Sequence, residues 1–308
     1  MLFSVDLGTP VNKAVDWLTE NLSGLFDAVT TVMTELVNAV LFVLTAPHMV
    51  VIIAVFTVLA FLARGWFFAV YTLGAFLLIQ GMGLWTPAMQ TLAVVVVASV
   101  FAVVIGVPIG IWAARSPLVS ALVRPVLDFL QTLPVFVYLI PAVFFFGIGL
   151  VPGVVATILF AISPAVRLTE LGIRQVDREV VEAAHAFGAR NGQILRGVQL
   201  PLALPSIMAG INQVIMLALS MVVIAGMVGA DGLGTIVVRG ISQLDVGIGF
   251  QGGLAVVFLA IFLDRTTSAL ATPRIRRWPG RGRTGTTPPV ADTEKSSSPA
   301  SPTTPVSA

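Results

Sequence analysis

The chain has 308 residues, of which 57% are hydrophobic and 10% are charged, with a mean hydropathy of +0.99. Soluble proteins are roughly half apolar and a quarter charged, so this composition disfavours a soluble enzyme, a nucleic-acid-binding protein and a disordered chain. It indicates an integral membrane protein. The net charge of +2 gives no reason to expect a polyanionic partner, and the absence of cysteine excludes disulfides, thiolate metal ligands and a cysteine nucleophile.

Residues 1–48 are predicted to form an extracytoplasmic segment built around an amphipathic helix at 14–41. Apolar side chains recur there with helical spacing, while Asp16, Glu20 and Asp27 lie off the apolar stripe. This pattern is typical of a helix lying along the membrane surface. A kinked extra span from Leu36 through Pro47 is the alternative. The stripe consists of Val15, Leu18, Leu22, Leu25, Val29, Met33, Leu36 and Val40.

Seven candidate transmembrane helices follow, since a helix needs roughly 20 apolar residues to cross the hydrocarbon core. Pro108, between two glycines, predicts a kink or break near the end of the third span, and Pro134 and Pro141 predict the same in the fourth. The sequence therefore predicts an all-α polytopic membrane protein with a transmembrane domain at 49–270. The approximate spans are 49–63, 66–82, 88–114, 125–148, 152–171, 203–229 and 249–270.

Charge is concentrated between the fifth and sixth spans, where residues 173–202 carry seven charges and the preceding 124 residues carry six. Lys and Arg near span ends mark the cytoplasmic side. If this segment is cytoplasmic, seven spans place 15 of the 17 basic residues on that side. The acidic N-terminus is then outside and the C-terminus inside. Residues 271–308 have a basic start followed by Pro, Ser and Thr, which predicts a disordered cytoplasmic tail.

The charged segment contains a motif of specific spacing: E-A-A, three residues, G, nine residues, then V-x-L-P. It resembles the EAA signature of ATP-binding cassette (ABC) importer permeases, which has isoleucine at the place of Val198. The motif residues are Glu182, Ala183, Ala184, Gly188, Val198, Leu200 and Pro201.

The same segment predicts two short helices. The first covers 178–187 and ends at Gly188, because glycine readily takes the left-handed conformation that terminates helices. The second covers about 191–198, and Pro201 is expected to stop it and redirect the chain into the next span.

These helices would form a knob that fits a groove on a soluble partner. Phe187 is its expected apolar anchor, and Glu182, Arg190 and Arg196 its charged rim. A self-packed hairpin without a partner is the alternative. The 308 residues contain no P-loop for ATP phosphates, so this chain is predicted to be a transporter subunit rather than an enzyme, with ATP and magnesium bound by a separate ATPase subunit.

Polar residues within the spans are candidates for the translocation path. Asp128 either attracts a cationic cargo or pairs with Arg124 one helical turn away. Phe144–146 and the ring of Tyr138 offer cation–π faces, although ordinary packing is favoured. Neutral polar residues of the sixth span either line the path or bond to other helices. The path candidates are Asp128, Gln131, Tyr138, Asn212, Gln213 and Ser220. No catalytic residue and no metal site is expected.

Further stretches resemble the glycine betaine/proline betaine permease family over about residues 88–270. The resemblance implies the fold of a type I ABC importer permease, a homodimer, two cytoplasmic ATPase subunits and an extracytoplasmic substrate-binding protein. It also implies osmoprotective uptake of a quaternary-ammonium solute by alternating access across the bacterial cell membrane. The stretches are LDFLQTLP at 127–134, VYLIP at 137–141, RLT at 167–169, LGIR at 171–174, QLPLALP at 199–205, MAGINQ at 208–213 and LSMVVIA at 219–225.

Two other functions remain open from the sequence. An ABC permease for another small solute, such as an amino acid, fits the same motif. A secondary transporter or channel would need inverted repeats or paired intramembrane acids, which the sequence does not clearly offer, and it leaves the spacing of the EAA motif unexplained.

Overall fold

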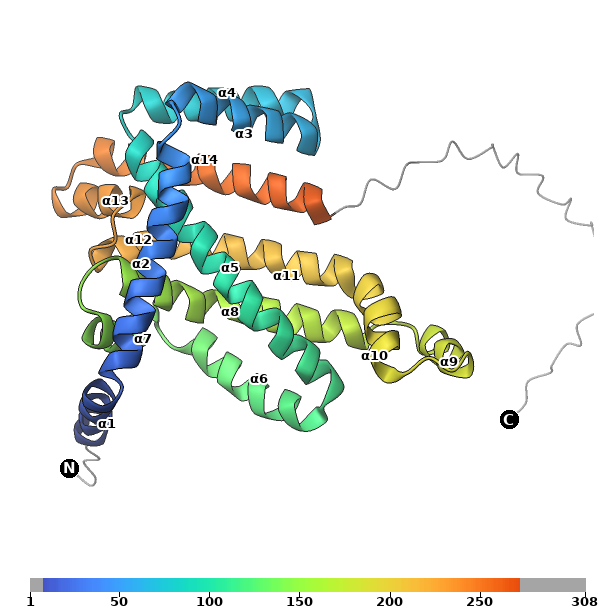
Figure 1. Cartoon of the computed structure of the whole chain (residues 1–308). Helices are drawn as coiled ribbons and strands as arrows, with labels where there is room; N and C mark the ends of the chain where they lie inside the picture. Colours follow the sequence, from blue (N-terminus) through green and yellow to red (C-terminus); the bar gives the residue numbers. More distant parts are fainter. Residues whose placement is uncertain (1–7, 272–308) are drawn as a thin grey trace, which may run out of the picture. The chain divides into compact units, whose positions relative to one another are not determined.

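The computed structural model describes residues 8–271, which fold into helices without any strand (Figure 1). The predicted all-α architecture is therefore confirmed for this part of the chain, and the predicted tail lies outside it. The helices are α1 (Gly8–Asn21), α2 (Ser23–Thr45), α3 (Met49–Arg64), α4 (Trp66–Gly81), α5 (Trp85–Arg115), α6 (Pro117–Thr132), α7 (Val135–Phe146), α8 (Leu150–Arg174), α9 (Arg178–Ala186), α10 (Asn191–Ile194), the π-helix η1 (Leu195–Gln199), α11 (Leu200–Ser220), α12 (Val222–Met227), α13 (Leu233–Ser242) and α14 (Val246–Ala271).

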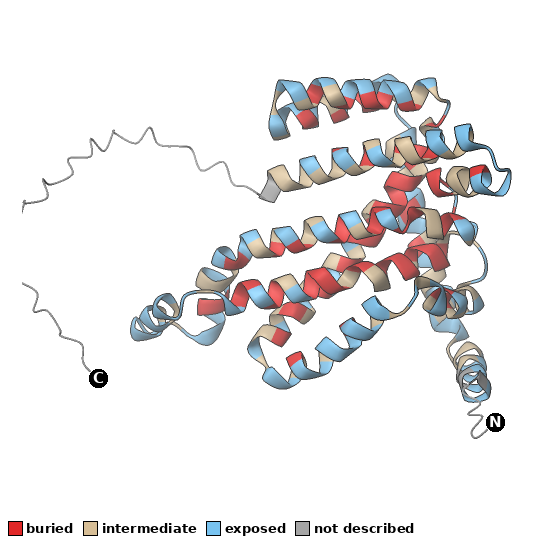
Figure 2. Cartoon of the chain, turned by 180° about the vertical axis from the view of Figure 1, so that it is seen from behind, coloured by how far each residue is buried: buried red, intermediate tan, exposed pale blue. Residues whose placement is uncertain are grey.

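The N-terminal region differs from the single helix predicted at 14–41, because α1 and α2 meet at a break at Leu22. Met33 and Val37 of α2 are buried, and α2 contacts α5, α7 and α8. At 23 residues it is long and apolar enough to span a membrane, yet Figures 1 and 2 show it running transverse to α8, α11 and α14. The direction of α2 favours a helix that lies along the membrane surface, whereas its length alone favours an extra transmembrane span.

Five helical segments within the described residues are long and apolar enough to cross a membrane, and the α6–α7 pair makes a sixth if it counts as one span. The third, fifth, sixth and seventh predicted spans correspond to α5, α8, the continuous run at 191–227, and α14. The first two correspond to α3 and α4, which have 16 residues each and are shorter than the roughly 20 needed for an untilted crossing.

Proline has different consequences in two of the predicted spans. The fourth span is broken at Leu133 and Pro134, where α6 and α7 meet at a bend of 96°. Pro141 lies inside α7 and does not end it. The break predicted near Pro108 is not found, because α5 continues as one helix to Arg115.

Helix α8 lies at the centre of the fold, between α5 and α11, and much of its length is buried (Figure 2). Glycine permits the close approach on both sides. A Cβ atom at Gly110 of α5 would lie 2.6 Å from the carbonyl oxygen of Val166, and one at Gly172 would lie 2.7 Å from the Cβ of Ser206 on α11. Small residues at such contacts let helix backbones pack tightly within a membrane.

A peripheral layer of α3, α4 and α14 packs on this centre. Phe56, Phe76 and Phe262 join its three helices, with ring centroids 4.9 to 5.3 Å apart. Such aromatic contacts stabilise packing beyond the area that they bury. The layer contacts two helices of the centre, α11 and α5.

The packing around α8 makes Gly110 intolerant of a side chain. We expect Gly110→Leu to destabilise the protein by about 3 kcal/mol or more, because the new side chain meets backbone and not a flexible side-chain end. Gly74→Leu on α4 is the matched control, since nothing lies within 4 Å of its Cβ position. Thermal unfolding of the purified variants measures the difference, and equal melting temperatures would contradict this account of α8.

Candidate functional site

The predicted first helix of the EAA motif is α9, and local hydrogen bonds explain both its ends. Asp177 caps the start, because its Oδ1 accepts from the backbone N–H of Glu179 at 3.0 Å. Gly188 ends it with φ +82°, a conformation that favours glycine, while the N–H of Ala189 donates to the carbonyl of Ala184 at 3.1 Å. The predicted helix stop at Gly188 is thus confirmed.

The second helix continues further than predicted. Helix α10, the π-helix η1 and α11 follow one another without a loop, and Pro201 lies in the first turn of α11. Proline is tolerated at this position because its missing N–H has no partner to lose. The expectation that Pro201 stops the helix is therefore wrong, and the motif is joined rigidly to a membrane helix through a π-helix, a feature often found at functional sites.

We call residues 175–199 the EAA loop. Its tip is exposed: α9 has no buried residue and Phe187 is 92% exposed. Its base is anchored, because Ile194 and Leu195 are buried and Leu195 packs with Ile173 of α8 and the start of α11. Within the loop α9 packs against α10 and η1, while none of its residues is buried, so both the docking knob and the self-packed hairpin fit this geometry.

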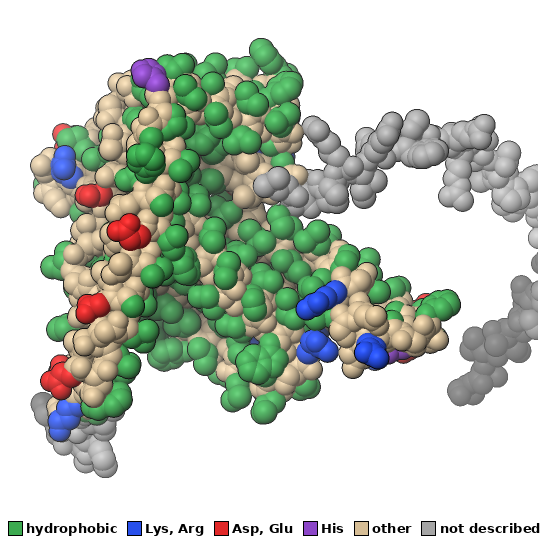
Figure 3. Space-filling model, viewed as in Figure 1, with side chains coloured by type: hydrophobic (Ala, Val, Ile, Leu, Met, Phe, Trp, Pro, Cys, Tyr) green, Lys and Arg blue, Asp and Glu red, His purple; other side chains and the backbone are tan. Residues whose placement is uncertain are grey.

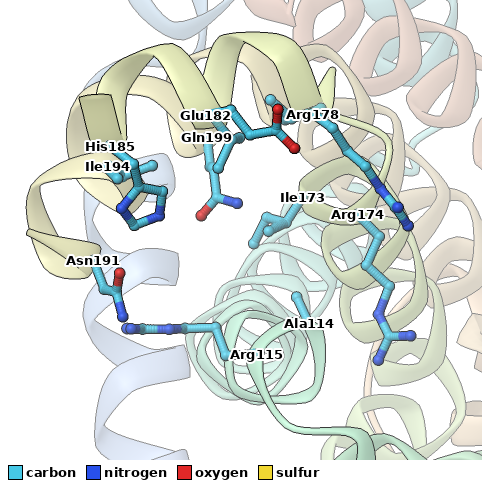
Figure 4. Close-up of a pocket in the computed structure, with 12 residues that line it drawn as sticks. Ala114, Arg115, Ile173, Arg174, Arg178, Glu182, His185, Asn191, Ile194 and Gln199 are labelled. Atoms are coloured by element: carbon cyan, nitrogen blue, oxygen red, sulfur yellow. The ribbon is translucent and has the colours of Figure 1, made fainter. Parts of the chain in front are cut away.

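A cavity of about 410 Å³ lies between the EAA loop and the ends of α5 and α8 (Figure 4). Arg178, Glu182 and His185 of α9 face it from one side, and Arg115 at the end of α5 lies on the other. Glu182, predicted for the charged rim of the knob, is exposed and lines this cavity. Arg190 and Arg196 are exposed, and the backbone N–H of Arg190 donates to Gln193 at the start of α10.

A second group of charges joins α6 to α8. Glu170 is buried, and its Oε1 accepts from Ser120 at 2.7 Å and from Arg124 at 2.9 Å and forms an ion pair with Arg174 at 3.0 Å. Arg174 also donates to the carbonyl of Ala113 on α5 at 2.9 Å. A buried carboxylate is stable only when paired and hydrogen-bonded, so this network fixes the ends of three helices.

Asp128 does not have the ion-pair partner expected from the sequence. Its partner is Arg167 of α8, while Arg124 is bound to Glu170. The predicted Asp128–Arg124 pair is therefore wrong. Sequence spacing identified neighbours on one helix, and no local signal pointed to a residue 39 positions away.

The other path candidates are not brought together. Asn212 of α11 donates to Asp264 of α14 at 2.8 Å and accepts from Thr267 at 3.0 Å, which is the helix-to-helix bonding considered from the sequence. Ser220 donates to its own helix, the hydroxyl of Tyr138 is buried without a hydrogen-bond partner, and Gln131 and Gln213 are exposed.

The phenylalanine run of α7 shows the packing that the sequence favoured. Phe145 stacks on Phe26 of α2 with centroids 4.6 Å apart, and Phe146 meets the same ring edge-on. Phe144 is 68% exposed. Two of the three rings are thus occupied in joining α2 to α7.

Long apolar helices with an exposed EAA loop define a multi-pass membrane component of an ABC-type transport system. The chain belongs to the binding-protein-dependent transport system inner membrane components, a family that matches residues 106–277. A chain of the inward-facing MetNI methionine ABC transporter has the same fold, with a TM-score of 0.55 at 23% identity over 61% of this chain and 94% of that one. The expected type I ABC permease fold is thereby confirmed.

Three relatives are similar over most of their length. The glycine betaine transport system permease protein OpuAB of Bacillus subtilis is 46% identical, covering 89% of this chain and 97% of its own. The glycine betaine/proline betaine permease protein ProW of Escherichia coli is 47% identical, with 93% and 80% covered. The glycine betaine/carnitine permease protein GbuB of Listeria monocytogenes is 49% identical, with 86% and 95% covered.

The Glu170 network and the Asp128–Arg167 pair should contribute differently to the stability of the protein. Glu170→Ala leaves two arginines without their carboxylate, and we expect a loss of about 3 kcal/mol, at the low end for a buried pair because both arginines are partly exposed. Asp128→Asn removes an exposed pair and should cost about 0–1 kcal/mol. Thermal unfolding of both variants tests this, and a larger loss for Asp128→Asn would contradict it.

Proposed function

We propose that this chain is the permease subunit of an ABC importer that takes up glycine betaine, proline betaine or a related quaternary-ammonium compatible solute. The observation that supports it most directly is identity of 46–49% over most of the chain to permeases named for glycine betaine. The functional unit is a homodimer of this chain with two ATPase subunits and an extracytoplasmic substrate-binding protein. Its role is osmoprotective uptake.

The charge distribution supports an orientation. Acidic side chains follow α1 and α2, and arginines gather near α9 and α10 (Figure 3). Basic residues collect on the cytoplasmic side of membrane proteins. We therefore infer that the EAA loop and the C-terminus are cytoplasmic and that the N-terminal segment is outside.

The EAA loop is the proposed contact with the ATPase. Phe187 and the two alanines of the motif provide an exposed, slim apolar face of the kind that inserts into a groove. Since α10 and η1 lead directly into α11, displacement of the loop moves α11, and Asn212 carries the movement to α14. ATP-driven closure of the ATPase dimer would thus alternate the access of the transport path.

The competing functions fit the structure less well. A secondary transporter needs intramembrane acids free to bind the coupling ion. Among the described residues, Asp128, Glu170 and Asp264 each have a partner within the chain. Cargo selection by a phenylalanine cage is also poorly supported, since Phe145 and Phe146 pack against Phe26. Selectivity is instead expected in the binding protein.

The proposed cargo is tested by uptake into proteoliposomes that hold the permease with its ATPase and binding protein. Labelled glycine betaine should accumulate only with ATP. Excess proline betaine should compete, and glycine should not, because it lacks the quaternary methyl groups. Equal competition by glycine or another amino acid would favour the alternative of an amino-acid permease.

The coupling role is tested at Phe187. We expect Phe187→Ala to lower ATP-driven uptake at least about tenfold, because loss of a central aromatic contact costs about 2 kcal/mol or more of binding. It should also release the ATPase subunit during purification. Ile148→Ala is the control, as Ile148 is 82% exposed in the turn between α7 and α8, whereas the EAA loop follows the other end of α8. Unchanged uptake by Phe187→Ala would refute the assignment.

A further inference from the structure

A charged hollow lies on the flank of the fold between α6 and α8. Its volume is about 320 Å³, and five of its six lining residues are charged. The exposed side chains of α6 next to it are apolar, and Val126 and Phe129 are 57% and 60% exposed. We call it the α6–α8 hollow. It is lined by Arg124, Asp128, Arg167, Glu170, Leu171 and Arg174.

The hollow extends into the membrane-spanning part of the chain. Helix α8 is long and apolar enough to span, and Arg167 lies seven residues before its end, about 10 Å along the axis. Charges cost about 2.5–3.5 kcal/mol each at the centre of a transmembrane helix, and charges within such helices almost always face protein or water. Yet the side chains of Asp128 and Arg167 are 62% and 42% exposed. This face must therefore border water or protein and not lipid.

The charges of the hollow fall into a fixed part and an available part. Glu170 is buried, and its Oε1 accepts from Ser120 and Arg124 and pairs with Arg174, so this carboxylate is held in place. Among the described residues, Asp128 and Arg167 have only each other. Arg124 gives one nitrogen to Glu170, and its side chain is 58% exposed. The carboxylate of Asp128 and the guanidinium groups of Arg167 and Arg124 therefore remain available to a ligand.

We propose that the α6–α8 hollow is a transient binding site for a zwitterionic quaternary ammonium on its way to the cytoplasm, which rests on the function proposed above. Asp128 takes the ammonium end, and Arg167 and Arg124 take the carboxylate. The Asp128–Arg167 pair opens to admit the cargo and closes after it leaves. The charges of the site are balanced both when the cargo is bound and when the Asp128–Arg167 pair is closed, so the cargo binds weakly. A translocation path requires weak binding, because the cargo must leave the site again.

The chemistry selects a zwitterion over either half of it. A cation without a carboxylate would occupy Asp128 and leave Arg167 without its partner. An anion alone would leave Asp128 unpaired in the same way. Arginine binds carboxylates through parallel hydrogen bonds, and Leu171, 45% exposed, offers apolar surface to the methyl groups.

The natural chain has no cysteine, which permits a direct test with Leu171→Cys in the complete permease–ATPase complex in membrane vesicles. A membrane-impermeant thiol reagent applied from the cytoplasmic side should label position 171. Glycine betaine should slow labelling about threefold at twice its dissociation constant, when one third of the sites remain free. Choline and acetate at the same concentration should not.

Two variants make the result specific. Adding Asp128→Asn to Leu171→Cys should abolish protection by glycine betaine while labelling persists. Leu118→Cys, 70% exposed at the start of α6 and outside the hollow, should be labelled without protection. The proposal is overturned if position 171 is unreactive, if choline protects as well as glycine betaine, or if Asp128→Asn leaves protection intact. Betaine uptake that persists in those cases would leave the proposed function standing.

Discussion

The close contact of α8 with α5 and α11 is the constraint on which the rest of the structure depends. Gly110 and Gly172 bring backbone against backbone on the two sides of α8. In a membrane, where lipid is as apolar as the helices, such packing takes the place of the hydrophobic effect. This packing fixes the end of α8, and therefore the positions of Glu170 and of the base of the EAA loop. It also fixes one wall of the cavity beside the EAA loop and one wall of the α6–α8 hollow.

Buried charge then determines how the ends of these helices are joined. Glu170 binds groups from α6 and α8, and Arg174 continues the network to the backbone of α5. The EAA loop directly follows Arg174; its helix α9 begins four residues after Arg174, and the loop returns through η1 into α11. A movement applied at the loop therefore reaches helices that are already tied together.

Much of the architecture could be predicted from local pattern. Hydropathy located most of the long helices, the spacing of the EAA motif identified the loop, and Gly188 ends α9 as expected. The errors have a common source. Pro201 was expected to break a helix that it begins, and Asp128 was assigned to a neighbour on its own helix. Both depend on where the chain lies in three dimensions, which periodicity does not encode.

The sequence by itself determined the membrane class, the all-α fold and the position of the EAA motif, because hydropathy and motif spacing are properties of consecutive residues. Only the tertiary structure decided which charges meet. Asp128 and Arg167 are 39 residues apart in the sequence, so no local pattern pairs them. They meet because α8 packs against α6. Tertiary packing also places Glu182 at the cavity beside the EAA loop and joins Asn212 to α14.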